Sequence, residues 1–171
     1  MSSVPSRIRT FAYGSNMLTA RIRERAPSAK AIGIGCLRAH ALKWHKRSQD
    51  GSSKCDIEST GREQDAVWGV IFELDAADKP GLDRAEGVGL GYVERQVDVA
   101  MESGVVKAIT YIATARDPAL KPYHWYKAMV LAGAREHKLA PEYIRALEDV
   151  PSRRDLNEAR AARNEKLLAA G

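Results

Sequence analysis

Two turns in the sequence combine residue types that could do chemistry on a small molecule. In "FAYGSNM" (residues 11–17) a strand-like segment ends in Gly14, Ser15 and Asn16. Glycine can adopt a positive φ and lets a ligand approach the backbone closely. If a helix begins directly afterwards, the amide groups of this turn stay unpaired and can hold a carboxylate or a developing oxyanion. A turn that only caps a helix would have the same sequence, so the motif alone does not define a site.

The second turn places Glu86 before a glycine-rich stretch, in "LDRAEGVGLGY" (residues 82–92). The glycines would leave room beside the carboxylate, which could then act as a general base. A solvated glutamate at a helix end would fit the same pattern. Asp83 is the competing carboxylate, although three residues of spacing allow it to face elsewhere.

A third candidate is Tyr126, in the amphipathic pattern "YHWYKAMVLAGAREHKL". Trp125 and Met129 recur at helical spacing on one face, and Gly133 follows on that face. We expect Gly133 to mark a point of close packing. By spacing alone, Tyr126 could be no more than a packing residue of this helix.

These candidates must be positioned by a sheet followed by helices. The segment "AVWGVIFEL" (residues 66–74) is almost entirely apolar and is expected to be a central strand. Two further strands, at residues 92–101 and 105–114, read as a hairpin. Other extended segments are expected at 8–13 and 31–45, and helices within 17–26 and from 121 onward, with Pro141 starting one of them. This order predicts an α+β fold, a small, mixed, largely antiparallel β-barrel or curved sheet with peripheral helices, rather than a doubly wound fold.

Composition narrows the class of protein further. With 171 residues, of which 44% are hydrophobic, the chain is expected to form one domain. Cys36 and Cys55 form no CxxC pair, and the histidines show no metal-binding spacing, so we expect no metal. There is no apolar run long enough to span a membrane or to act as a signal peptide, which favours a cytoplasmic protein without a membrane partner.

The net charge of +5 raises the possibility of a nucleic-acid partner. In residues 151–171, however, basic and acidic side chains alternate at helical spacings, which is typical of a solvated helix. The other aromatic and basic cluster, "WHKR" (residues 44–47), is interpreted as a strand end with exposed charges. We therefore expect no nucleic acid.

Three blocks of the sequence together resemble one known family. "FAYGSNM" with the following "LTARIRERAPSA" resembles the N-terminal signature of the γ-glutamylcyclotransferases, which include the AIG2-like proteins. "LDRAEGVGLGYVERQVDV" is similar to the family's acidic segment, and "YHWYKAMVLAGAREHKLAPEYIRAL" to its C-terminal helix. The blocks occur in the family's order and cover residues 10 to about 150.

The resemblance implies a small β-barrel with peripheral helices and a pocket at its mouth, with no metal and no organic cofactor. It assigns the general acid/base to Glu86 and a substrate contact to Tyr126. The substrate-binding strand and loop match Thr10, Phe11, Ala12, Tyr13, Gly14 and Ser15. Two positions depart from the family pattern: Thr10 stands where relatives can have an aromatic residue, and Pro141 lies one place late.

The implied substrate is a small γ-glutamyl compound. Its α-amine would attack its own γ-carbonyl, releasing 5-oxoproline and a free amine or amino acid. A cyclotransferase acting on γ-glutamylamines, an enzyme for another γ-glutamyl metabolite, and a non-catalytic binding module remain as alternatives. We expect a γ-glutamylcyclotransferase-like domain over residues 1–150 and a helical extension over 151–171. The sequence gives no indication of oligomeric state.

Overall fold

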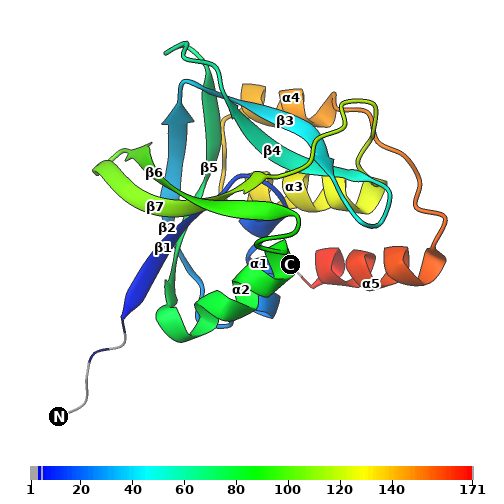
Figure 1. Ribbon diagram of the computed structural model, residues 1–171, viewed down its shortest axis with the longest axis horizontal. Coiled ribbons are helices and arrows are strands. Elements are labelled where there is room, and N and C mark those ends of the chain that lie inside the picture. The colour runs from blue at the N-terminus through cyan, green and yellow to red at the C-terminus, as the bar shows by residue number, and fades with distance from the viewer. Residues whose placement is uncertain (1–3, 5, 171) are drawn as a thin grey trace.

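Five strands close into a barrel in the computed structural model, which describes residue 4 and residues 6–170 (Figure 1). Around the barrel the strands are β1 (Arg7–Ala12), β5 (Ala66–Asp75), β2 (Lys30–Arg38), β6 (Tyr92–Met101) and β7 (Gly104–Ala113). All neighbours are antiparallel except β1 and β7, which close the barrel in parallel at Thr10 and Ile109. The predicted α+β fold with a mixed, largely antiparallel barrel is confirmed.

The two strongest strand predictions are also confirmed. β5 lies between β1 and β2, and its residues Val70, Ile71 and Phe72 are all fully buried. Consecutive buried residues require cover on both faces of the strand, which is why this segment shows an apolar run instead of alternation. β6 and β7 pair along their whole length as the expected hairpin.

A second, two-stranded sheet was only half predicted. The expected extended region 31–45 is two strands, β2 and β3 (His40–Arg47), separated by Ala39 with a φ of +58°. Its partner β4 (Ser53–Ser59) has no counterpart among the predicted strands. In β4 the charged residues Lys54 and Asp56 alternate with Cys55 and Ile57, and the tertiary structure buries both charged side chains.

Five helices and two short 3₁₀ turns surround the sheets. The helices are α1 (Thr19–Arg25), α2 (Lys79–Glu86), α3 (His124–Glu136), α4 (Pro141–Glu148) and α5 (Glu158–Ala169). The turns are η1 (Ser15–Met17) and η2 (Ala76–Asp78). Pro141 begins α4 as predicted, so its shifted place in the sequence does not displace the helix start. No helix in the described part of the chain has the length and apolarity needed to cross a membrane.

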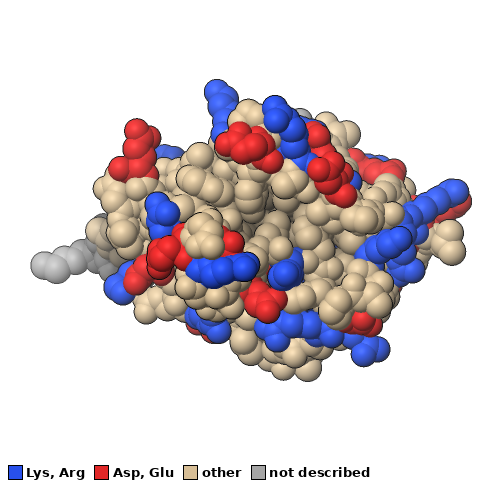
Figure 2. Space-filling model, turned by 90° about the horizontal axis from the view of Figure 1, so that it is seen from above, with Lys and Arg blue, Asp and Glu red and all other residues tan. Residues whose placement is uncertain are grey.

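The helix of the C-terminal segment, α5, is largely exposed, as its charge pattern predicts, but the residues before it are anchored to the rest of the protein. The Asp155 carboxylate is buried and accepts hydrogen bonds from Trp125 Nε1 at 2.9 Å and Arg160 Nε at 2.7 Å. The hydrogen bond from Trp125 attaches the segment before α5 to α3, and the ion pair with Arg160 connects the same carboxylate to α5. Figure 2 shows basic and acidic side chains interspersed over the face it presents, as the mixed sequence pattern indicates.

Gly133 lets α3 approach the turn that follows β1. A Cβ atom at this position would lie 2.5 Å from the backbone nitrogen of Leu18 and 2.6 Å from the carbonyl carbon of Met17. Both are backbone atoms, which cannot rotate away. The predicted close packing at Gly133 is confirmed, and its partner is the "GSNM" turn.

We therefore expect Gly133→Ala to destabilise the protein. In an unhindered helix this change would stabilise by about 1 kcal/mol, whereas overpacking here is expected to cost about 1–3 kcal/mol. Denaturant unfolding measures the difference. Ala128→Gly, at a partly exposed position of the same helix, tests helix propensity and should lose about 1 kcal/mol. A Gly133→Ala protein more stable than the wild type would contradict the packing argument.

Candidate functional site

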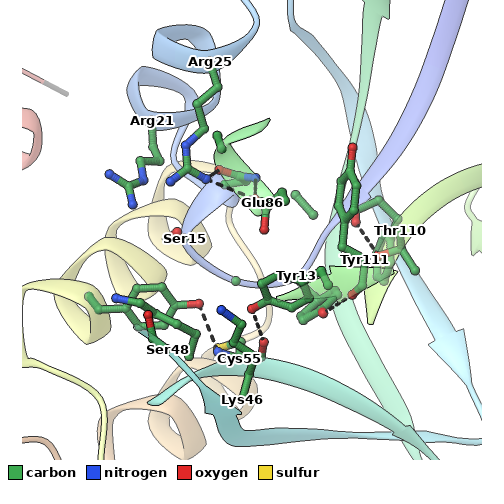
Figure 3. A pocket seen from close by; sticks show the side chains of 18 residues that line it. Tyr13, Ser15, Arg21, Arg25, Lys46, Ser48, Cys55, Glu86, Thr110 and Tyr111 are labelled. Atoms are coloured by element: carbon green, nitrogen blue, oxygen red, sulfur yellow. Dashed lines mark hydrogen bonds and ion pairs between the residues drawn. The ribbon is translucent and has the colours of Figure 1, made fainter. Parts of the chain in front are cut away.

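One cavity of about 140 Å³ collects almost all of the residues predicted to form a site (Figure 3). Its wall includes Phe11, Ala12, Tyr13, Gly14, Ser15, Glu86 and Tyr126. Thr10 is the exception. It is buried in β1 outside the cavity lining, and its hydroxyl has no hydrogen-bond partner in the described part of the chain.

Glu86 stands at the cavity with one oxygen held and the other free. It is the last residue of α2, which ends because Gly87 adopts a left-handed conformation with φ +63°. Glu86 Oε1 accepts hydrogen bonds from Asn16 Nδ2 at 2.6 Å and Arg25 NH1 at 3.0 Å. Oε2 accepts none from the described residues and lies on the cavity side in Figure 3. The carboxylate is therefore oriented with one oxygen available to a ligand.

The neighbouring carboxylate, Asp83, belongs to a different network. It accepts a hydrogen bond from Tyr111 Oη at 2.7 Å and pairs with Lys79 Nζ at 2.8 Å. Asp83 is not part of the cavity wall. Of the two candidate bases in this segment, only Glu86 reaches the site.

The turn after β1 leaves two backbone amides unpaired in the described part of the chain, and its glycine is required for close packing. Gly14 has a φ of −115°, so the positive φ that glycine allows is not used at this turn. Glycine is needed because a Cβ would lie 2.9 Å from Tyr126 Oη and 3.2 Å from Cys55 Cβ. The backbone amides of Gly14 and Ser15 donate to no group in the described part of the chain. They therefore remain available at the cavity wall.

Tyr126 is tied to the second sheet by its hydroxyl. Tyr126 Oη accepts a hydrogen bond from the backbone amide of Cys55 at 3.0 Å, and Tyr92 Oη donates to the carbonyl of Cys55 at 2.8 Å. Burial raises the pKa of both tyrosines well above its usual value. Both hydroxyls are therefore neutral and hold one residue of β4 at the cavity.

Several charged wall residues were missed by the sequence reasoning. They are Arg21 and Arg25 from α1, Lys46 from β3 and Lys54 from β4. The interpretation of "WHKR" as exposed charges is wrong for Lys46, of which only 9% is exposed. A charged residue that faces a cavity has the same sequence pattern as one that faces solvent, so no signal in the chain distinguished Lys46.

Lys54 is held in the wall by one carboxylate and two aromatic rings. Its ammonium lies 3.1 Å from Asp50 Oδ2 and covers the rings of Trp125 and Tyr126, with centroids at 4.3 and 4.6 Å. Burial lowers the pKa of Lys54 to about 8, against an ordinary value of 10.5, and the charge of Asp50 offsets part of this effect. Lys54 therefore loses its proton around pH 8, well below the pH at which an exposed lysine does so.

This shift predicts a pH-dependent stability. Between about pH 8 and 10.5 the unfolded chain binds more protons at Lys54 than the folded chain, so the stability contributed by this group rises with pH. We expect the free energy of unfolding of the wild type, relative to Lys54→Met, to increase by about 3 kcal/mol across that range. Urea unfolding at a series of pH values measures it. The exposed Lys43→Met is the control, and a flat Lys54→Met difference would contradict the shifted pKa.

Comparison with known proteins agrees with this geometry. Residues 66–147 match the AIG2-like family. Human γ-glutamylcyclotransferase is 37% identical over 150 residues, covering 82% of this chain and 77% of the relative. The bovine enzyme is 32% identical over 152 residues with the same coverage.

A solved structure also resembles this chain over nearly its whole length. This structure, named as a γ-glutamyl cyclotransferase, superposes with a TM-score of 0.84 at 28% identity, covering 97% of this chain and 100% of its own. The two chains therefore share one fold over nearly their full length. The chain belongs to the γ-glutamylcyclotransferase family.

Proposed function

We propose that this chain is a γ-glutamylcyclotransferase that converts a γ-glutamyl compound into 5-oxoproline and a free amine. The observation that carries the proposal is Glu86, held at Oε1 by Asn16 and Arg25 with Oε2 free beside a cavity. Relatives that bear this activity in their names match most of the chain.

The reaction suits a site without a serine or cysteine nucleophile, because the substrate carries its own. The α-amine attacks the γ-carbonyl carbon and closes a five-membered ring, and the bond from that carbon to the departing nitrogen breaks. Holding the chain in a folded conformation supplies proximity, so the remaining barrier is proton transfer and charge.

Glu86 carries the protons in this scheme. The substrate amine is an ammonium ion at neutral pH, and Oε2 takes a proton from it before attack. The protonated Glu86 then donates to the departing nitrogen. As the ring forms, the attacking nitrogen loses a second proton, which Glu86 accepts and passes to the departing nitrogen in the same way. The product amine therefore leaves as an ammonium ion, and Glu86 returns to its carboxylate form.

The free amides support the developing charge. As the γ-carbonyl becomes tetrahedral, its oxygen gains negative charge, which N–H groups stabilise. Gly14 and Ser15 present such donors on the cavity wall. Arg25 and Asn16 act on Glu86 and keep its free oxygen facing the substrate.

Glu86→Gln tests the assignment of the base. Glutamine keeps the size of the side chain but cannot accept the proton, so 5-oxoproline release from γ-glutamyl-alanine should fall about 10²- to 10⁴-fold. Glu58→Gln, on the exposed end of β4, is the control and should retain wild-type turnover. Full turnover by Glu86→Gln would show that another group moves the proton.

Tyr126→Phe tests the substrate contact. The change removes the acceptor of the Cys55 amide and the hydroxyl at the cavity wall. We expect KM for γ-glutamyl-alanine to rise about 5- to 10-fold, as for one lost hydrogen bond, with a smaller change in kcat. Thermal unfolding measured in parallel reports the structural share of the effect. An unchanged KM would limit Tyr126 to packing.

A further inference from the structure

Lys46 is a buried cation without an anion. Its side chain comes from β3 into the cavity wall, and its Nζ lies 4.7 Å from the ring centroid of Tyr92. Lys46 forms no ion pair with any residue in the described part of the chain. Burial lowers the pKa of Lys46, and the charge of Glu86 offsets part of this effect. An ammonium withdrawn from water without a counter-charge is costly, and a bound anion would remove that cost.

The other charges of the wall do not neutralise Lys46. Arg25 is paired with Glu86 at 3.0 Å, and Lys54 with Asp50 at 3.1 Å. Arg21, like Lys46, has no carboxylate partner in the described part of the chain. Its NH1 donates only to the neutral Asn164 Oδ1 at 3.2 Å. The wall thus holds two cations whose charge is not balanced by the protein.

A γ-glutamyl amino acid carries two carboxylates, one on each side of the scissile bond. A γ-glutamyl alkylamine carries only the α-carboxylate of the glutamyl unit. The two unbalanced cations, Arg21 and Lys46, match the first compound in number and leave one cation unsatisfied with the second.

Their positions assign the two carboxylates. Arg21 lies on α1, one turn before Arg25, which holds Glu86. The α-carboxylate shares a carbon with the amine that Glu86 deprotonates, so it belongs on this side of the cavity. Figure 3 shows Lys46 on the opposite side, below Glu86 and across from it. The carboxylate of the departing amino acid is linked through the nitrogen of the scissile bond, on the far side of the γ-carbonyl from the α-carboxylate. It therefore extends toward the Lys46 side.

We propose that Lys46 binds the carboxylate of the departing amino acid and so determines the specificity of the site for the leaving group. A leaving group that is a simple alkylamine forfeits this contact. The description of this group as a leaving group rests on the proposed function. The binding of a carboxylate by Lys46 does not, because it can be tested with ligands that cannot react.

The test uses two inert ligands, glutaryl-alanine and glutaryl-ethylamide. They differ only by the carboxylate of alanine, and neither can cyclise because both lack the α-amine. A hydrogen bond to a charged group predicts that the wild type binds glutaryl-alanine about 10- to 100-fold more tightly, as measured by titration calorimetry. Lys46→Met should abolish this preference without weakening glutaryl-ethylamide, and Lys46→Arg should retain it.

Lys43→Met is the matched control, because Lys43 is an exposed lysine of the same strand. It should keep the wild-type preference. The proposal is overturned if the wild type binds both ligands equally or binds neither. It is also overturned if Lys46→Met keeps the preference, or if it weakens both ligands alike, since Lys46 would then hold the glutaryl carboxylate.

Kinetics separate this proposal from the proposed function. With γ-glutamyl-alanine and γ-glutamyl-ethylamide as substrates, Lys46→Met should lower kcat/KM about 10- to 100-fold for the first and leave the second unchanged. If the binding preference depends on Lys46 but the wild type forms 5-oxoproline from neither compound, the proposed function is wrong and the role of Lys46 stands.

Discussion

The site depends on the three-way contact among Glu86, Arg25 and Asn16. Asn16 donates to Glu86 through Nδ2 and accepts from Arg25 through Oδ1, while Arg25 also donates to the same carboxylate oxygen. The three side chains come from α2, α1 and the turn after β1. One oxygen of Glu86 is therefore fixed by segments far apart in the sequence, and the other is left free at the cavity.

Close packing keeps those segments in register. Gly133 brings α3 against Met17 and Leu18, and Gly14 brings the same turn against Tyr126 and Cys55. The turn is thus held between α3 and the second sheet at separations that no larger side chain would allow. The packing on both sides restrains the turn while the amides of Gly14 and Ser15, at the cavity wall, donate to no group in the described part of the chain.

The two sheets have separate tasks at the cavity. The barrel, with the turn that follows β1 and with α2, supplies the groups assigned to proton transfer. The β3–β4 sheet supplies the two lysines, and Asp56 attaches it to the barrel. The fully buried Asp56 carboxylate accepts from the amide of Ala113 at 2.9 Å and from His45 and Arg116 at 2.8 and 2.9 Å. The two lysines of the wall and the Glu86 side of the cavity therefore come from separate sheets that are joined at Asp56.

The sequence by itself determined the elements whose reason is local. The apolar run of β5, the β6–β7 hairpin and the Pro141 helix start follow from side-chain periodicity and backbone restriction. The motif resemblance named Glu86 and the turn at Gly14. Only the tertiary structure decided that Thr10 lies outside the cavity, that Gly14 avoids a clash instead of adopting a positive φ, and that Lys46 and Lys54 face inward. The reason is physical: a lysine that faces a cavity and one that faces solvent occupy equivalent positions in a strand. What covers Lys46 and Lys54 is the packing of Tyr92, Trp125 and Tyr126, which come from other parts of the chain.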